Sequence, residues 1–334
     1  MMNDNSAALA RSITRAGSKQ TYYTTHLLVD KDLVDDCNRA YAYFRWVDDI
    51  IDVTAQSDDE RIAFIKRQKK LIDGLYSNEQ PNDLRPEEEI LADLISHDRG
   101  KNSGLQSYIR NMFAIIEFDT YRKGQLISQQ ELTWYSDCLA KAVTDGILYF
   151  IGNSHPYPAT DDRYRAATAA HITHLLRDMV EDVSNGFVNI PREYLEAHGI
   201  GPEDVHSLAF RAWVRERVEL ARQYFREGKR YLDELDVLRC KIAGYWYCVR
   251  FEVVLDAIEH DHYILRAEYN ERRSSSTWLK MAWLSIAVTG RHLARQGLRV
   301  GWRRHEQMGL DSSNQRAIVL STPEPSRMLT HHRG

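Results

Sequence analysis

Two short acidic segments contain the residue types best suited to chemistry in this chain of 334 residues. In YFRWVDDIID, and again in LLRDMVED, two aspartates stand four residues apart, as Asp48 with Asp52 and Asp178 with Asp182. Residues at this spacing share one face of an α-helix. Carboxylate oxygens suit Mg²⁺, which proteins commonly bind together with the phosphate groups of a substrate. The two segments therefore predict a magnesium site for a phosphorylated ligand.

The first acidic pair continues a stripe of aromatic residues. Tyr41 and Phe44 precede Asp48 and Asp52 at helical spacing, so we expect these acids to point inward among aromatic neighbours. Charged groups rarely lie on a buried stripe unless cations or hydrogen bonds compensate for their lost hydration. This position therefore implies a bound ligand.

The second acidic pair lies on a helix that also has two different sides. His174, Asp178 and Asp182 share one side, and Leu176 and Met179 belong to the adjacent apolar stripe. If the two acidic sides face each other across a helical bundle, several Mg²⁺ ions between them could bind a bridging diphosphate.

Several segments of the chain resemble the squalene and phytoene synthase family of isoprenoid enzymes. The resemblance runs from about residue 18 to about residue 289 and is weaker at 254–269. It implies an all-α isoprenoid synthase fold, a helical bundle around a deep apolar cavity. It also implies coupling of two farnesyl or geranylgeranyl diphosphates head to head, to a squalene- or phytoene-like product. The matching segments are SKQTYY at 18–23, AYAYFRWVDDIID at 40–52, ELTWYSDCLAKAVTDG at 131–146 and THLLRDMVEDVSNGFVNIPREYLEAHGI at 173–200.

The same resemblance implies a cofactor and residue roles. The cofactor is several Mg²⁺ ions, with three expected once diphosphate is bound, and the partner is a prenyl diphosphate. Direct or water-bridged metal ligands would be Asp48, Asp52, Asp178 and Asp182, with Asp49 and Glu181 as supporting or occasional ligands. Catalytic roles fall to Tyr41, Tyr135, Arg45 and Arg177. Substrate-binding roles fall to Ser18, Lys19, Phe44, Ala140, His174, Asn189 and Arg266.

The chain also departs from the family pattern at several positions. His174 stands where the family usually has asparagine, and Phe187 and Asn189 stand where it has arginine and tyrosine. Phe251 replaces a further tyrosine, and Arg266 aligns poorly with the expected arginine. Because the acidic segments are intact, we expect ionisation of the diphosphate to be retained. The departures leave the coupling step and the product open.

Three functions are consistent with this pattern. The first is head-to-head coupling. The second is a divergent class I terpene synthase that ionises one prenyl diphosphate and cyclises it. The third is a non-catalytic lipid-binding relative, which has no physical need for inward carboxylates on two helices.

Composition and charge give the remaining expectations. The net charge of −4 and the lack of a basic, aromatic-rich patch exclude nucleic acid as a partner. We expect a flexible N-terminus over residues 1–17, the catalytic domain over 18–290 and a basic C-terminal helix and tail over 291–334. That last segment has eight arginines against three acids and could rest on an anionic membrane, or form a disordered tail.

The location of the protein follows from two further features. No signal peptide or membrane-spanning segment is visible, because the apolar run at 278–288 is short and interrupted by Lys280. The four cysteines have no CxxC spacing, which favours reduced thiols. We expect a cytoplasmic protein, with peripheral membrane association through the basic tail as an open alternative.

Overall fold

The computed structural model describes residues 2–98, 100–152, 155–271 and 274–296, without the side chains of residues 2–4, 52 and 53. The chain divides into one compact unit that ends at Leu284 and a second that begins at Ser285. Residues 275–284 are helical and close the first unit. The preceding helices are α1 (Met2–Gly17), α2 (Lys19–Leu28), α3 (Val34–Asp49), α4 (Asp58–Tyr76), α5 (Pro86–Ser96), α6 (Gly104–Arg122), α7 (Gln129–Phe150), α8 (Arg165–Ser184), α9 (Arg192–His198), α10 (Leu208–Glu234) and α11 (Leu238–His260).

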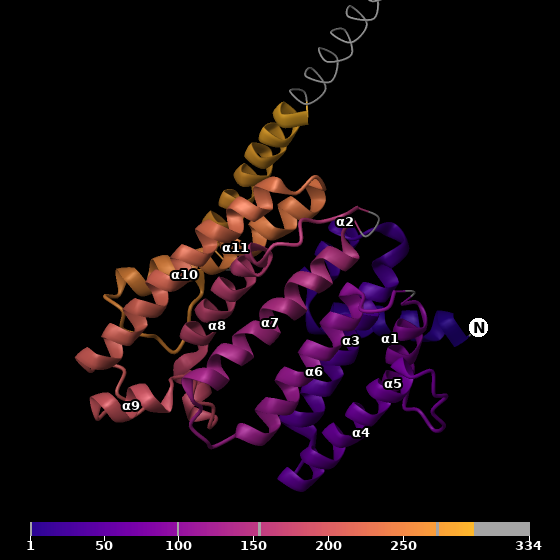
Figure 1. The fold of residues 1–334 in the computed structure, drawn as a ribbon, viewed down its shortest axis with the longest axis horizontal. Helices are drawn as coiled ribbons and strands as arrows, with labels where there is room; N and C mark the ends of the chain where they lie inside the picture. The colour runs from indigo at the N-terminus through magenta and orange to yellow at the C-terminus, as the bar shows by residue number, and fades with distance from the viewer. Residues whose placement is uncertain (1, 99, 153–154, 272–273, 297–334) are drawn as a thin grey trace, which may run out of the picture. The chain divides into compact units, whose positions relative to one another are not determined.

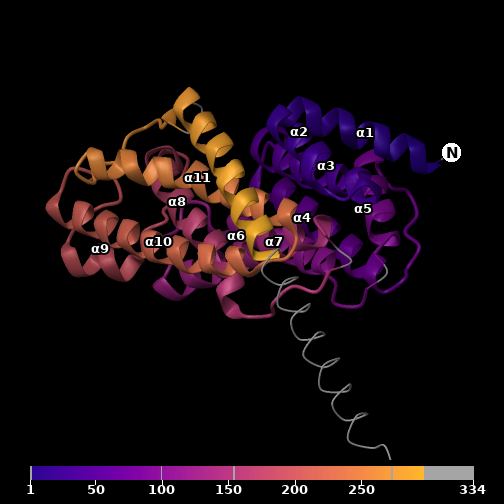
Figure 2. The ribbon, with the colours of Figure 1, turned by 90° about the horizontal axis from the view of Figure 1, so that it is seen from above.

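The first unit is a bundle of long helices, as predicted. Helix α7 packs between α6 and α8, and α8 packs in turn against α10 and α11 (Figure 1). On the other side α3 packs against α1 and α5 (Figure 2). Helices α3 and α8 each bury one face, with Tyr43 and Val47 on α3 and Leu176 and Met179 on α8. The two acidic segments therefore lie on helices that are fixed by packing.

Local sequence signals set the ends of the helices that carry site residues. Helix α7 begins at a capping box, in which the Ser128 hydroxyl accepts from the Glu131 amide and the Glu131 carboxylate accepts from the Ser128 amide. Helix α3 passes into a π-helical turn at Ile50–Thr54. After α8, Gly186 has a φ of +88°, a conformation that favours glycine, and the chain turns back toward α8.

Two expectations about domain organisation need comment. The prediction of a flexible segment at 1–17 is wrong, because residues 2–17 form α1, which packs against α3 and α5. Ala7, Ala10 and Thr14 are buried, and their small side chains at helical spacing allow close packing. Most of the predicted basic tail, residues 297–334, lies outside the described residues. None of the described helices combines the length and apolar character needed to cross a bilayer.

A buried polar network attaches α4 and α5 to α3. Glu88 is fully buried and accepts hydrogen bonds from Arg67 at 2.7 and 2.6 Å, from Gln68 at 2.8 Å and from the Arg85 amide at 2.9 Å. The hydroxyl of Tyr43, on α3, donates to Gln68 at 3.0 Å. Burial alone would raise the pKa of Glu88, but these hydrogen bonds outweigh it and lower the pKa to about 2.

Glu88→Gln is expected to destabilise the protein by about 2 kcal/mol at pH 7, because the neutral amide weakens charge-assisted hydrogen bonds in a buried site. A depressed pKa in the folded state stabilises it above the unfolded value of about 4.5, and this stabilisation fades as the pH falls toward 2. Urea unfolding at pH 7 measures the loss. The exposed neighbour Glu89→Gln is the control, and equal stability of the two variants would contradict the role of the network.

Candidate functional site

Carboxylates from both acidic segments line one pocket of about 290 Å³, which we call the acidic pocket. Asp48 comes from α3 and Asp182 from α8, although 134 positions separate them in the sequence. Three further predicted residues, Tyr135, His174 and Asn189, line the same pocket. The structure thus places residues from α3, α7, α8 and the segment after α8 around one space.

The surroundings of Asp182 disfavour the charged form of its carboxylate. Its carboxylate accepts a hydrogen bond from Asn189 at 2.9 Å, and the backbone turn after α8 is closed by the Phe187 amide, which donates to the Asp182 carbonyl at 2.8 Å. Burial raises the pKa of Asp182 to about 6, and the negative charge of Asp178 adds to the shift, while His174 and Arg122 oppose it. A bound cation would therefore stabilise the charged form of Asp182 more strongly than that of an exposed carboxylate.

Arg177 and His174 both contact the Asp178 carboxylate. The Arg177 guanidinium donates to it at 2.5 Å, and His174 Nε2 lies 2.8 Å from its carboxylate. Burial alone would raise the pKa of Asp178, but these contacts outweigh it and hold the pKa below the usual range. Asp178 does not line the acidic pocket, but His174, which contacts its carboxylate, does.

The first acidic segment differs in part from the prediction. The expectation of an inward-pointing acid is wrong for Asp48, which is exposed at the pocket wall. The side chain of the neighbouring Asp49 is 46% exposed. The buried face of α3 is instead formed by residues such as Tyr43 and Val47. Asp49 forms an ion pair with Arg45 at 2.5 Å. The side chain of Asp52 is outside those described.

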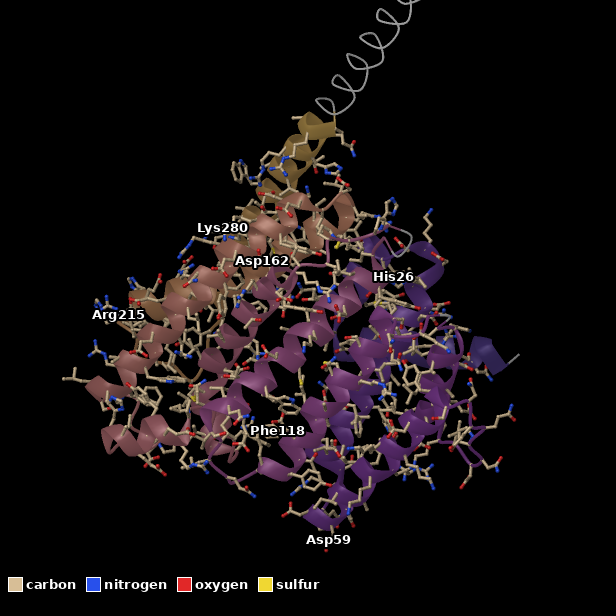
Figure 3. All side chains as sticks on the ribbon, viewed as in Figure 1. His26, Asp59, Phe118, Asp162, Arg215 and Lys280 are labelled. Atoms are coloured by element: carbon tan, nitrogen blue, oxygen red, sulfur yellow. The ribbon has the colours of Figure 1, made fainter. Side chains whose placement is uncertain are left out.

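A cluster on α6 was missed in the sequence. Asp119 accepts a hydrogen bond from the Tyr135 hydroxyl at 2.8 Å and another from Arg122 at 2.6 Å, and the Arg122 guanidinium lies 5.0 Å from the Tyr135 ring centroid. Burial raises the pKa of Tyr135. Phe118, which lies on α6 like Asp119 (Figure 3), packs against the ring of Tyr135 on α7. Asp119 follows the buried Ile115 and Ile116 at helical spacing, which could have indicated it as a candidate, although this spacing does not report its contact with Tyr135.

His171 and three basic residues complete the missed lining of the acidic pocket. His171 is buried, with its ring centroid 5.0 Å from that of Tyr135, and burial lowers the pKa of its imidazole to about 3. It is therefore neutral at physiological pH. Arg61, Arg122 and Lys123 bring positive charge to the same pocket, as an anionic ligand requires.

A second space in the same unit has the opposite character. This apolar cavity, of about 330 Å³, is formed by residues of α2, α3, α6, α7 and α11, with Met281 from the helix that follows. Tyr41 lines it, as predicted, together with Tyr108, Phe150, Trp246 and Tyr247. The predicted apolar cavity is therefore present, and its wall can shelter a hydrocarbon chain.

Five of the predicted substrate-binding residues line neither space: Arg266, described below, and four residues of α2, α3, α7 and the cap of α2. Phe44 is 3% exposed and packs edge-on against Tyr108, so it supports the cavity wall from behind. Ala140 is buried within α7. Ser18 caps α2, where it accepts from the Thr21 amide, and Lys19 is exposed at the start of that helix.

Arg266 and Glu181 were also predicted for the site, and the structure places both of them elsewhere. Arg266 pairs with Asp261 and, at 2.6 Å, with Glu271, so it joins the end of α11 to the next segment. Glu181 is exposed on α8 and lines neither space. Arg266 lines neither space.

Comparison with known proteins decides the family. The sequence profile of the squalene/phytoene synthase family matches residues 14–278. The chain belongs to this family. Phytoene synthase of Daucus carota is 26% identical over 259 residues, which cover 73% of this chain and 61% of that protein. Presqualene diphosphate synthase of Sinorhizobium fredii is 27% identical over 168 residues, covering 50% and 57%. 15-cis-Phytoene synthase of Synechococcus elongatus is 24% identical over 137 residues, covering 40% and 43%. The chain thus spans less than two thirds of the length of each of these family members.

Solved structures of the family show the same fold. A squalene synthase from Alicyclobacillus acidocaldarius matches with a TM-score of 0.62 and 19% identity, over 78% of this chain and 95% of that one. A dehydrosqualene synthase matches with a TM-score of 0.60 and 16% identity, over 86% and 96%. The prediction of an all-α isoprenoid synthase fold is confirmed.

The donor atoms of the acidic pocket suit Mg²⁺, although they do not form a complete site. Among the described side chains, no three His, Cys, Asp or Glu residues come together as a ligand set. Mg²⁺ usually takes one or two carboxylates and completes its shell with water and substrate phosphate. Asp48 and Asp182 provide such carboxylates, and the buried Asn189 has an Oδ1 atom with no hydrogen-bond partner among the described residues.

Proposed function

We propose that the protein is a Mg²⁺-dependent transferase that ionises an allylic prenyl diphosphate and couples two prenyl chains head to head. The observation that carries this proposal is the acidic pocket, which receives carboxylates from both α3 and α8 in the same unit as an apolar cavity. The diphosphate would bind in the acidic pocket, and the hydrocarbon chain would bind in the apolar cavity. Membership of the squalene/phytoene synthase family supports the same reaction class.

The proposed metal ligands are the aspartates of the two acidic segments. Asp48, Asp52, Asp178 and Asp182 would bind Mg²⁺ directly or through water, with Asp49 and Glu181 in supporting positions. The metal would supply charge neutralisation for the diphosphate as the allylic carbon–oxygen bond breaks. Arg45 and Arg177 would donate hydrogen bonds to the same group once it displaces part of their present pairing with Asp49 and Asp178.

Loss of the diphosphate would leave an allylic carbocation on the prenyl chain. The residues around Tyr135 are suited to stabilise this cation. Aromatic faces stabilise a cation and exclude water. Tyr135, fixed by its hydrogen bond to Asp119, offers such a face beside the acidic pocket, and Tyr41 offers one in the apolar cavity. The nearby His171 is neutral, so it adds no repulsive charge.

Cyclisation of a single prenyl chain is the second candidate. The apolar cavity, at about 330 Å³, is at the lower end of the volume range of ligand pockets, which favours one chain at a time. The altered residues His174 and Asn189 line the acidic pocket, so they could change the fate of the carbocation. Non-catalytic lipid binding is the third candidate and predicts no release of pyrophosphate.

A product assay distinguishes the three functions. Purified protein is incubated with Mg²⁺ and, separately, with geranyl, farnesyl and geranylgeranyl diphosphate; pyrophosphate release is measured and the products are identified by mass. We expect release that stops when EDTA removes the metal, and a product with twice the carbon count of the substrate. A product with the carbon count of one chain would establish cyclisation. No release with any of the three substrates would refute both enzymatic proposals.

A further inference from the structure

The apolar cavity has one charged group in its wall. Arg250, on α11, is the only charged residue among the described residues that line this cavity, and it lies next to Trp246 and Tyr247 in that wall. Hydrophobic walls of this kind usually exclude a full charge, since transferring it out of water costs several kcal/mol. A guanidinium at this position therefore calls for an explanation.

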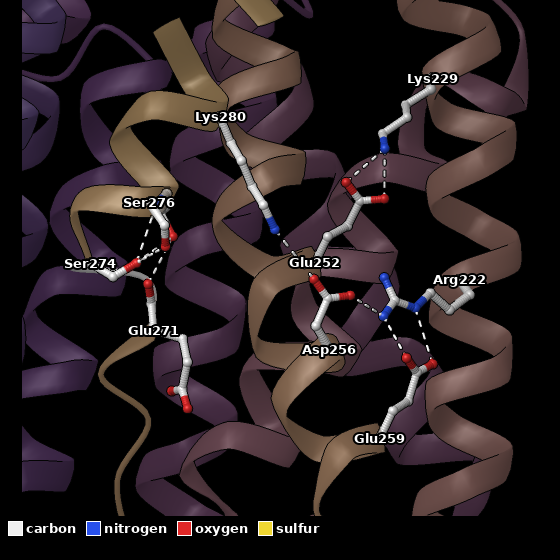
Figure 4. Close-up of polar contacts among 10 residues, drawn as sticks. Arg222, Lys229, Glu252, Asp256, Glu259, Glu271, Ser274, Ser276 and Lys280 are labelled. Atoms are coloured by element: carbon white, nitrogen blue, oxygen red, sulfur yellow. Dashed lines mark hydrogen bonds and ion pairs between the residues drawn. The ribbon is translucent and has the colours of Figure 1, made fainter. Parts of the chain in front are cut away.

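Arg250 has no hydrogen-bond or ion-pair partner within the described part of the chain, although its helix is rich in carboxylates. Each of those carboxylates is already paired with another cation (Figure 4). The pairs are Glu252 with Lys229 at 2.6 Å, Asp256 with Arg222 at 2.6 Å and with Lys280 at 3.7 Å, and Glu259 with Arg222 at 2.8 Å.

The electrostatic surroundings of Arg250 are unfavourable. Burial lowers the pKa of its guanidinium; Tyr247 opposes this effect, and the positive charge of Arg177 adds to it. Among the described residues Arg250 has no counter-ion, so a bound anion would offset its repulsion by Arg177.

The neighbour Arg177 indicates which anion this is. Arg177 hydrogen-bonds Asp178, whose other partner, His174, lines the acidic pocket. Arg250 thus lies where the wall of the apolar cavity approaches the acidic segment of α8. A molecule with its hydrocarbon part in the cavity would present its charged end to this junction. The planar guanidinium binds phosphate oxygens in a bidentate manner, which suits a diphosphate.

We infer that Arg250 is a substrate-binding residue that donates hydrogen bonds to the diphosphate of the prenyl substrate, together with Arg177. This inference rests on the proposed function for the identity of the prenyl chain, whereas the anion site itself does not depend on turnover. The sequence motifs did not indicate Arg250, because it lies outside both acidic segments.

The test compares Arg250→Leu with Arg215→Leu, a control on the outer face of α10 whose side chain is 63% exposed (Figure 3). Titration calorimetry measures the binding of inorganic pyrophosphate in the presence of Mg²⁺. Arg250→Leu is expected to raise the Kd about ten- to a hundredfold, the usual value of charge-assisted hydrogen bonds. Arg250→Lys should fall between this variant and the wild type, because it retains the charge without the planar fork.

Thermal unfolding separates binding from a structural role. Removing a partly buried cation that has no ion-pair partner among the described residues should leave the Tm unchanged or raise it, whereas removing a structural contact would lower it. Unchanged pyrophosphate binding by Arg250→Leu, no binding by the wild type, or a lower Tm with unchanged binding would each overturn the inference.

A second arm identifies the source of the phosphate. The same variants are titrated with farnesyl diphosphate and with farnesol, and we expect the Arg250→Leu effect with the diphosphate alone. An equal loss of affinity for farnesol would overturn the inference, since the residue would then act on the hydrocarbon chain. If the wild type binds pyrophosphate through Arg250 but consumes no prenyl diphosphate, the proposed function fails and the anion site stands.

Discussion

Asp48→Asn is expected to lower turnover of a prenyl diphosphate by about a thousandfold. The change removes one negative charge from the wall of the acidic pocket, where the proposed metal neutralises the leaving diphosphate. Stabilisation of developing charge by a bound metal is worth several kcal/mol, which corresponds to this factor in rate. Because Asp48 is exposed, the shape-conserving substitution should leave the stability of the fold almost unchanged.

The control for this variant is Asp58→Asn. Asp58 belongs to the first turn of α4, and its side chain is 80% exposed and pairs with Arg61. It matches Asp48 in residue type and exposure but does not line the acidic pocket. Pyrophosphate release at saturating Mg²⁺ is the measurement. If Asp48→Asn retained the rate of Asp58→Asn, the assignment of Asp48 to the metal site would have to be abandoned.

The sequence was most informative where helical periodicity and residue chemistry coincide. Four-residue spacing placed Asp178 and Asp182 on one face of α8, and both lie there beside His174. The all-α architecture and the apolar cavity followed from the family resemblance. Local patterns of this kind are predictable because a helix fixes the relative directions of its own side chains.

Contacts between helices were less predictable. Asp119 belongs to the cluster around Tyr135 only because α6 packs along α7, and no spacing within α6 reports that neighbour. The same limit applies to Arg250: its lack of an ion-pair partner among the described residues depends on which cations from α10 and from the helix after α11 reach the carboxylates of α11. Helix α1 was missed for another reason: its buried stripe consists of small residues, which give a weak hydrophobic signal.

The position of Asp182 shows how such packing prepares a site for a cation. Asn189 and the turn at Gly186 hold this carboxylate partly buried near a second carboxylate, Asp178, so the metal-free protein is destabilised locally. A cation that binds here removes this destabilisation, and the free energy released increases its affinity for the site. The same arrangement makes the site sensitive to protons, which compete with metal for the carboxylate.

Activity at limiting Mg²⁺ is therefore expected to fall about tenfold per pH unit below pH 6, because protonated Asp182 must lose its proton before it binds metal. At saturating Mg²⁺ the fall should begin at lower pH, since the metal displaces the proton by mass action. Initial rates measured between pH 5 and 8 at two Mg²⁺ concentrations test this. A profile that does not depend on Mg²⁺ concentration would exclude Asp182 as the competing group.

The stability of the metal-free protein should change in the opposite direction. The pKa of Asp182 rises from 3.8 to about 6 on folding, so the folded state binds more protons between these values and the free energy of unfolding decreases as the pH rises through this window. Above pH 6 the decrease in the free energy of unfolding reaches its full value, which is on the order of 2 kcal/mol. Asp182→Asn should accordingly raise the Tm by several degrees at pH 7.5 in EDTA, with little gain at pH 4. Adding Mg²⁺ with pyrophosphate should stabilise the wild type much more than the variant. A variant that is less stable than the wild type at pH 7.5 in EDTA would show that Asp182 serves the fold and not the metal.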